Sequence, residues 1–204
     1  AVIEDLEIKQ DLYRRVDTAR KPGSIVTSNT STIPLAKLVS GLPEGFARDF
    51  AITHFFNPPR YLRLLEVVAG THTRVDAITS LQAFGDRALG KSVVQCKDTP
   101  GFIANRIGIL WTTSAIRFAF EDQLSVEEAD AIVGRPMGIP KTGVFGLMDL
   151  VGIDLQPHVS ASMLSSLPEQ DMFRDLHQES ELIARMIREG YTGRKGKGGF
   201  YRLN

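Results

Sequence analysis

The stretch FAITHFFNPPRYLRLLEVVAG, residues 50–70, contains two apolar runs that are separated by two prolines. The first run is FAITHF (50–55), and the second, YLRLLEVVAG (61–70), ends at a glycine. Short apolar runs bounded by Pro and Gly are typical of buried strands. Glu66 is unexpected in the second run, because a carboxylate in a buried strand is costly unless a hydrogen-bond donor or a cation meets it.

A possible partner for Glu66 is His54, which stands near the end of the first run. Side chains at the carboxyl end of a strand project into the crevice where α/β sheets bind ligands. A neutral imidazole there could donate one ring N–H to Glu66 and keep its other nitrogen for proton transfer. Spacing alone nevertheless favours the alternative, a core histidine and a glutamate that pairs with Arg60 or Arg63.

Strands and helices alternate around this stretch. SIVTSN (24–29) and SVVQCK (92–97) are further predicted strands. Alternation of this kind implies βαβ units and a largely parallel sheet over residues 1–98. The helices predicted in this part span 1–19, 31–40 with Ser31 or Thr32 as N-cap, and 73–89 with Thr73 as N-cap.

From residue 99 onward the sequence predicts an all-α domain. Its first helix follows the Pro-Gly turn at 100–101 and runs for about twenty residues, judged by its helical periodicity. The next helix carries Ser125 as N-cap and Glu128 at the capping-box position. Two more helices are predicted at about 150–165 and 171–189. The chain is therefore divided into an α/β domain, 1–98, and an all-α domain, 99–204.

Composition excludes several classes of protein. Hydrophobic residues make up 43% and charged residues 24%, as in a globular protein with a real core. The formal net charge of zero argues against a nucleic-acid partner. The single cysteine excludes an internal disulfide and suits a reducing cytoplasm, and the histidines lack metal-ligand spacing, so no metal is expected. The longest apolar stretch, 107–116, is too short to span a membrane.

Six segments occur in an order and at spacings that closely resemble those of the NAD-dependent L-3-hydroxyacyl-CoA dehydrogenases. They are SNTST, HFFNPP, LLEVV, CKDTPGFIANR, RPMG with LMDLVGID, and GRKGKGGFY, and they cover nearly the whole chain. The resemblance implies the C-terminal half of a Rossmann-type domain followed by a helical dehydrogenase dimerisation domain. It also implies oxidation of L-3-hydroxyacyl-CoA to 3-ketoacyl-CoA with NAD in fatty-acid β-oxidation.

The resemblance assigns roles to individual residues. The histidine of the family's HFFNP motif is the general base, and the glutamate of its LxEV strand pairs with it, which implies a catalytic dyad of His54 and Glu66. Ser31 and Asn105 match the residues that hold the substrate oxygen. The implied cofactor contacts are Ser31 and Asn57 on the nicotinamide side, Glu4 and Lys9 on the ribose side, and Lys195, for which Arg194 and Lys197 are close rivals.

The sequence departs from the family pattern in two places. The glycine-rich strand–turn–helix that binds the pyrophosphate is absent from these residues, and the chain starts inside a predicted helix. We therefore expect an inactive fragment of an active parent. The segment between RPMG and LMDLVGID is longer than in small single-function members, which indicates a larger, multifunctional β-oxidation protein.

Two other functions stay open at this point. One is a related dehydrogenase of short or non-CoA hydroxy acids, and the other is a catalytically silent helical dimerisation module. The expected partners are a 3-hydroxyacyl-CoA substrate and a second copy of the chain, which would form a homodimer through the helical domain.

Overall fold

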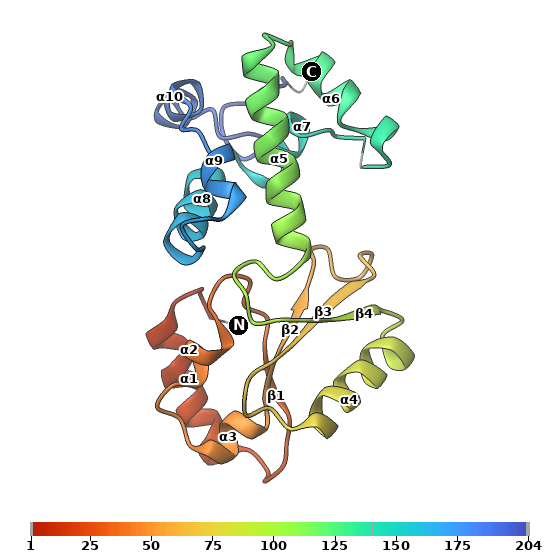
Figure 1. Cartoon of the computed structure of the whole chain (residues 1–204), viewed down its shortest axis with the longest axis vertical. Helices are drawn as coiled ribbons and strands as arrows, with labels where there is room; N and C mark the ends of the chain where they lie inside the picture. The colour runs from red at the N-terminus through yellow and green to blue at the C-terminus, as the bar shows by residue number, and fades with distance from the viewer. Residues whose placement is uncertain (1, 140, 203–204) are drawn as a thin grey trace. The chain divides into compact units, whose positions relative to one another are not determined.

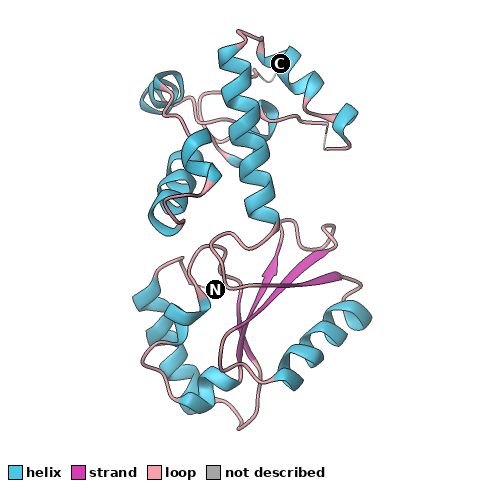
Figure 2. Cartoon of the chain, viewed as in Figure 1, coloured by secondary structure: helices cyan, strands magenta, loops and turns pink. Residues whose placement is uncertain are grey.

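The computed structural model describes residues 2–139 and 141–202. Its internal contacts divide the chain into two compact units, Ala1–Arg106 and Ile107–Asn204. The first unit combines a sheet with helices, and the second is built of helices (Figure 2). This arrangement confirms the predicted fold class, whereas the domain boundary after residue 98 remains a prediction.

The sheet of the first unit has the strand order β1-β2-β3-β4. The strands are β1 (Val26–Ser28), β2 (Phe50–Phe55), β3 (Leu64–Ala69) and β4 (Ser92–Cys96). β1 and β2 are parallel, as are β3 and β4, but β2 and β3 are antiparallel. The predicted parallel pairing is therefore wrong for the two central strands. Residues 56–63, which join them, are too few for the crossover that a parallel pair needs.

Helices cover both faces of this sheet (Figure 1). One face packs against α1 (Leu6–Ala19), α2 (Leu35–Val39) and α3 (Glu44–Arg48), and the other against α4 (Val75–Ala83), which continues as a π-helical turn (Phe84–Ala88). Alternate strand residues divide between the faces, as the pleat requires. On β2, Phe50 and Ile52 belong to the core under α1–α3, whereas Ala51 belongs to the core under α4.

The second unit has its own core. Ile116 of α5, Phe145 of α7 and Ile183 of α10 are buried together in it. Among the described residues, no helix is both long enough and apolar enough to cross a lipid bilayer. The helices are α5 (Ala104–Glu121), α6 (Val126–Ile132), a 3-10 turn (Arg135–Met137), α7 (Phe145–Val151), α8 (Leu155–Ser166), α9 (Met172–Leu176) and α10 (Glu181–Glu189).

Two helices predicted as continuous are interrupted. The predicted helix at 150–165 is broken at Gly152, whose φ of 116° ends α7 before α8 begins. The predicted helix at 171–189 is broken where Ser180 caps α10. The first break falls at a glycine, and the second lies within the polar run HQESE (177–181). The predicted capping box of Ser125 and Glu128 is confirmed.

Two predicted N-caps are wrong. Thr73 does not cap α4, whose N-cap is Arg74. The Thr73 hydroxyl instead accepts a hydrogen bond from the Gly70 N–H and donates one to the Phe50 carbonyl oxygen, both at 2.8 Å. Neither Ser31 nor Thr32 caps α2. The carboxylate of Asp98 accepts hydrogen bonds from the first two N–H groups of α2, at 2.8 and 3.1 Å. A cap supplied from the end of β4 cannot be found by looking for a local Ser or Thr.

Candidate active site

His54 and Glu66 lie directly opposite each other in the antiparallel pairing of β2 with β3. Nδ1 of His54 is 2.8 Å from Oε2 of Glu66, and the two residues are only 6% and 0% exposed. The pairing predicted from the family motifs is confirmed in its geometry. Glu66 pairs with His54 rather than with Arg60 or Arg63, which were the alternative partners.

The second carboxylate oxygen of Glu66 is also occupied. Oε1 accepts hydrogen bonds from the backbone N–H groups of Ile103, at 3.0 Å, and Ala104, at 2.8 Å. Burial by itself raises the pKa of Glu66, but the hydrogen bonds from His54 and from these two amides outweigh it and hold that pKa below its ordinary value. A carboxylate inside an apolar strand is tolerated here because three donors converge on it.

The hydrogen bond to Glu66 decides which nitrogen of His54 can act on a substrate. An ionised carboxylate only accepts hydrogen bonds, so Nδ1 must be the donor and carry the proton. The neutral imidazole then presents Nε2 as its basic nitrogen. The hydrogen bond therefore fixes the orientation of the imidazole and leaves Nε2 without a partner in the dyad, so that this nitrogen can take part in proton transfer.

Two aromatic rings contact the imidazole of His54. The ring of Phe56 lies edge-on at 4.5 Å between centroids, and the ring of Phe102 lies edge-on at 5.5 Å. Phe102 is buried, at 5% exposure. The sequence motifs did not single out Phe102 as a residue that contacts the dyad.

The segment that carries Ser31 is fixed by hydrogen bonds on both sides. Asn29 accepts a hydrogen bond from the backbone N–H of Phe55, the residue after His54, at 2.8 Å. Glu4 accepts one from the Thr30 hydroxyl and one from the Ser31 N–H, the latter at 3.2 Å. Asn29 thus links this segment to the backbone beside His54 by a hydrogen bond. No sequence motif predicted this contact.

Glu4 and Lys9, both predicted to face a cofactor ribose, are paired with each other. Nζ of Lys9 is 3.0 Å from Oε2 of Glu4, and Lys9 is only 7% exposed. Burial raises the pKa of Glu4, but hydrogen bonds from Thr30 and Lys9 hold it below its ordinary value. The structure thus connects Glu4, Lys9 and Ser31 in one polar network.

Two predicted site residues lie at the ends of the elements that carry the dyad. Asn105 is in the first turn of α5, immediately after the two N–H groups that bind Glu66. Asn57 follows β2 and precedes Pro58 in a cis peptide bond. Within the described part of the chain, neither asparagine forms a hydrogen bond with His54.

Cys96, the free cysteine, is buried at the end of β4 on the same face of the sheet as Glu66. Burial and then the negative charge of Glu66 raise the pKa of its thiol to about 11. A thiol with such a pKa is protonated at neutral pH and is a poor nucleophile. Cys96 therefore serves the core, as the sequence indicated.

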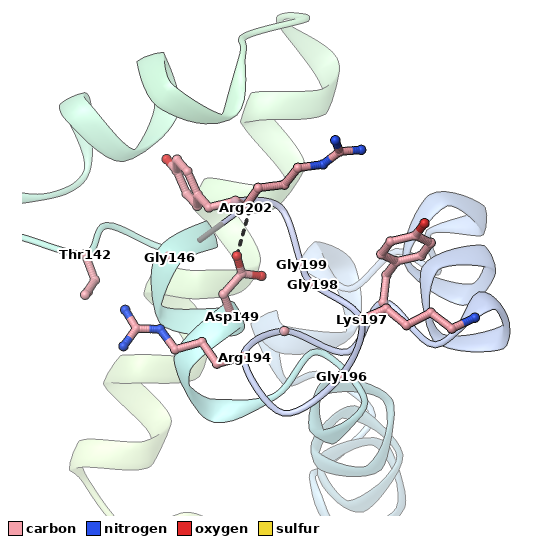
Figure 3. Close-up of a pocket in the computed structure, with 12 residues that line it drawn as sticks. Thr142, Gly146, Asp149, Arg194, Gly196, Lys197, Gly198, Gly199 and Arg202 are labelled. Carbon is pink, nitrogen blue, oxygen red and sulfur yellow. Dashed lines mark hydrogen bonds between the residues drawn. The ribbon is translucent and has the colours of Figure 1, made fainter. Parts of the chain in front are cut away.

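Lys195 belongs to the second unit. Its Nζ lies 2.8 Å from Oδ1 of Asp154, and its side chain is 55% exposed. The glycine-rich segment around it borders a cavity of about 620 Å³. Figure 3 shows that Arg194, Lys197 and Arg202 point in different directions around this cavity, so the three cations do not converge on one point.

Asp149 fixes the shape of the glycine-rich segment. Its carboxylate accepts hydrogen bonds from the backbone N–H groups of Phe200 and Tyr201, at 2.9 and 2.8 Å. Figure 3 shows one of these bonds as a dashed line from Asp149. A Cβ added at Gly199 would collide with that carboxylate. The glycine is needed for this close approach, because any larger residue would place its Cβ in the position of the carboxylate.

Comparison with known proteins decides the family. The family model described as the NAD-binding domain of 3-hydroxyacyl-CoA dehydrogenase matches residues 1–99, and the model of the C-terminal domain matches residues 101–203. The chain belongs to the 3-hydroxyacyl-CoA dehydrogenase family. Both halves of the resemblance found in the sequence motifs are thereby confirmed.

Similar proteins include members of different total length. A putative fatty acid oxidation complex trifunctional enzyme of Rickettsia felis is 41% identical over 100% of this chain and 28% of its own length. The mitochondrial hydroxyacyl-coenzyme A dehydrogenase of Homo sapiens is 34% identical over 99% of this chain and 62% of its own length. The chain therefore spans about a quarter to two thirds of these relatives.

Solved structures show the same fold. The crystal structure of M. tuberculosis FadB2 has a TM-score of 0.86 and 30% identity, and it is matched over 100% of this chain and 69% of its own. A 3-hydroxybutyryl-CoA dehydrogenase from Escherichia coli has a TM-score of 0.78 and 27% identity, over 98% of this chain and 41% of its own. A Rossmann-type part followed by a helical part is therefore the architecture of this chain.

Proposed function

We propose that the intact protein oxidises L-3-hydroxyacyl-CoA to 3-ketoacyl-CoA with NAD, as a step of fatty-acid β-oxidation. The observation that carries the proposal is the buried hydrogen bond between His54 and Glu66, in a chain of the 3-hydroxyacyl-CoA dehydrogenase family. A secondary alcohol needs a base for its hydroxyl proton and an acceptor for its C3 hydride. The imidazole supplies the base.

The proton step follows from the tautomer of His54. Nε2 takes the proton of the 3-hydroxyl while the C–H bond at C3 breaks and a C=O bond forms. NAD, when bound, supplies the acceptor for the hydride. In the reverse direction the imidazolium returns its proton to the oxygen of the ketone.

Glu66 stabilises the imidazolium formed in this step. Its carboxylate lies 2.8 Å from Nδ1 and is held in place by two backbone N–H groups, so it does not have to move as the charge on His54 develops. A preorganised charge in a buried site favours the transition state more than the same charge in water.

Ser31 and Asn105 would hold the reacting oxygen. Ser31 is attached to the backbone beside His54 through Asn29, and Asn105 follows the amides that bind Glu66. Both residues are thus connected to the dyad by short, hydrogen-bonded paths. This connection supports a shared role, because an oxygen that loses its proton must lie near the base and the donors together.

The residues fit only part of an NAD molecule. The linked set of Glu4, Lys9 and Ser31 offers charged and hydroxyl groups of the kind that bind a ribose and a nicotinamide amide. Asn57 and Lys195 complete the proposed contacts. The glycine-rich turn that binds a pyrophosphate is not among these 204 residues. We propose that a polypeptide limited to them is inactive.

A homodimer through the helical unit is part of the proposal. Ile107, Leu110 and Phe118 of α5 recur at helical spacing and are 63%, 43% and 52% exposed. An exposed apolar stripe of this kind is typical of a contact with another protein surface. A cytoplasmic setting, where the Cys96 thiol stays reduced, completes the proposal.

The experiment that tests this function is a substrate series on the full-length protein. NAD-dependent oxidation would be measured for L-3-hydroxyacyl-CoA esters of increasing chain length and for the corresponding free hydroxy acids. The proposal expects turnover of the CoA esters and little turnover of the free acids. Preference for free acids would favour the related dehydrogenase instead, and no turnover of either class would favour a silent module.

A further inference from the structure

Phe102 adopts a backbone conformation that its residue type disfavours. Its φ is +48°, in the left-handed region, directly after Gly101 with a φ of +74°. A Cβ in this region crowds the neighbouring carbonyl oxygen, so bulky side chains are rare there. Phe102 is also buried, at 5% exposure. Such an outlier persists only where its surroundings compensate for it.

This conformation brings both the ring of Phe102 and the backbone of the next two residues into contact with the dyad. The ring meets the imidazole of His54 edge-on, with 5.5 Å between centroids and 61° between planes. The next two residues, Ile103 and Ala104, direct their backbone N–H groups at Oε1 of Glu66. Turning the chain at Phe102 therefore brings an aromatic ring to the base and two donors to its carboxylate.

The ring is continuous with the core under α1–α3. Phe102 belongs to the same buried cluster as Ile52, Val68 and Cys96. These residues lie on the sheet face that also carries His54 and Glu66. The ring therefore packs edge-on against the imidazole from within this core. Because an edge-on aromatic contact has a preferred geometry, it limits rotation of the imidazole.

We propose that Phe102 is a positioning residue, whose ring fixes the plane of the His54 imidazole and excludes water from its hydrogen bond with Glu66. The inference rests on the proposed function, in which His54 is the base. Its effect on rate would come from orientation, since a base that leaves the productive plane loses the alignment with the substrate hydroxyl.

The test uses two substitutions in the full-length protein. Phe102→Leu removes the ring but keeps an apolar side chain. Phe46→Leu is the matched control, because Phe46 is 0% exposed in the same cluster and its ring packs against Tyr13 and Phe50. The ring contacts of His54 among the described residues are with Phe56 and Phe102 instead. If Phe102→Leu does not fold, Phe102→Met takes its place, because the flexible side chain of methionine fills irregular space.

Two readouts separate positioning from stability. For Phe102→Leu we expect kcat to fall about tenfold with KM for acetoacetyl-CoA within about twofold, as misalignment would cause. We also expect the NMR signal of the His54 Nδ1–H proton to shift or broaden through exchange with water. Phe46→Leu should lower thermal stability and leave both kcat and that signal unchanged.

The outcomes distinguish this inference from the proposed function. If the wild-type protein turns over and Phe102→Leu matches it in kcat and in the Nδ1–H signal, Phe102 does not position His54. If both variants lose kcat equally, the effect is one of general stability and the inference is also overturned. If the wild type transfers no hydride, the proposed function fails, and the Nδ1–H signal alone then decides whether Phe102 orders the dyad.

Discussion

Glu66 accepts the Nδ1–H of His54 with one carboxylate oxygen and two backbone N–H groups at the start of α5 with the other. A single buried side chain therefore orients the imidazole and fixes the chain just before Asn105. Both oxygens must be acceptors for this arrangement to exist. A substitution that turns one of these oxygens into a donor therefore breaks part of the arrangement.

Glu66→Gln should impair both catalysis and folding. A glutamine amide replaces one acceptor by a donor, so it must face either the Nδ1–H of His54 or the two backbone N–H groups with the wrong polarity. We expect kcat to fall by about a hundredfold and the free energy of unfolding by about 2 kcal/mol. Steady-state kinetics and urea denaturation measure the two effects.

A control separates the two effects of that substitution. Asp130 in the second unit is a buried carboxylate that also accepts two backbone N–H groups, at 2.8 and 2.9 Å. Asp130→Asn should lower stability without a comparable loss of kcat. Equal loss of kcat in both variants would mean that Glu66 acts only through folding.

Asp49 should make the stability of the first unit depend on pH. It is 7% exposed and accepts hydrogen bonds from Arg20, at 2.5 Å, and Arg74, at 2.6 Å. Burial raises its pKa, but the two guanidinium groups outweigh burial and hold the pKa below its ordinary value. The stabilisation is therefore present above the unfolded-state pKa, about 3.9, and is lost as the pH falls through the lower folded-state pKa.

Unfolding in urea at several pH values checks this. Asp49→Asn should cost about 3 kcal/mol at neutral pH and should flatten the loss of stability at acid pH. Glu181→Gln is the control, because the ion pair of Glu181 with Arg188 is exposed and should contribute little. If the Asp49→Asn variant loses stability at acid pH as steeply as the wild type, Asp49 is not the source of that pH dependence.

If the helical unit forms a dimer, the full-length protein should have twice its monomer mass, and this mass should not change with protein concentration. Phe118→Glu places a charge in the apolar stripe of α5 and should shift the protein to a monomer in sedimentation equilibrium. Val75→Glu, at an 80% exposed position on α4, should leave the dimer intact. A wild-type monomer at micromolar concentration would rule the dimer out.

A polypeptide of residues 1–204 alone should fold without binding NADH tightly. Each unit has its own buried core, so folding does not require additional chain. The proposed contacts at Glu4, Lys9 and Asn57 address only part of the dinucleotide, and the glycine-rich turn that would bind the pyrophosphate is not among these residues. Calorimetric titration with NADH measures this. Micromolar binding together with hydride transfer to acetoacetyl-CoA would contradict it.

Parts of the fold were accessible from the sequence because they depend on local pattern. The apolar runs around His54 and Glu66 predicted β2 and β3, and Ser125 with Glu128 predicted the start of α6. The antiparallel pairing was missed, although the short link 56–63 excludes a crossover. The break at Ser180 was also missed, although the polar run HQESE (177–181) interrupts the apolar pattern there.

The site was predictable as a set of residues but not as a geometry. Family motifs named His54 and Glu66, and the cost of a buried carboxylate explained why they should meet. The roles of Asn29 and Asp98 depend on partners 26 and 63 positions away in the chain, which one sequence does not reveal. The left-handed conformation of Phe102 was equally hidden, because phenylalanine rarely adopts it and no local pattern signals it.

The most direct test of the account is the kinetics of His54→Gln in the full-length protein, measured with NAD and an L-3-hydroxyacyl-CoA ester alongside the affinity for NADH. If His54 is the base, kcat should fall by about a thousandfold, while the Kd for NADH stays within about twofold of the wild type, because the imidazole acts on the substrate proton. A His54→Gln protein that keeps wild-type turnover would contradict the account.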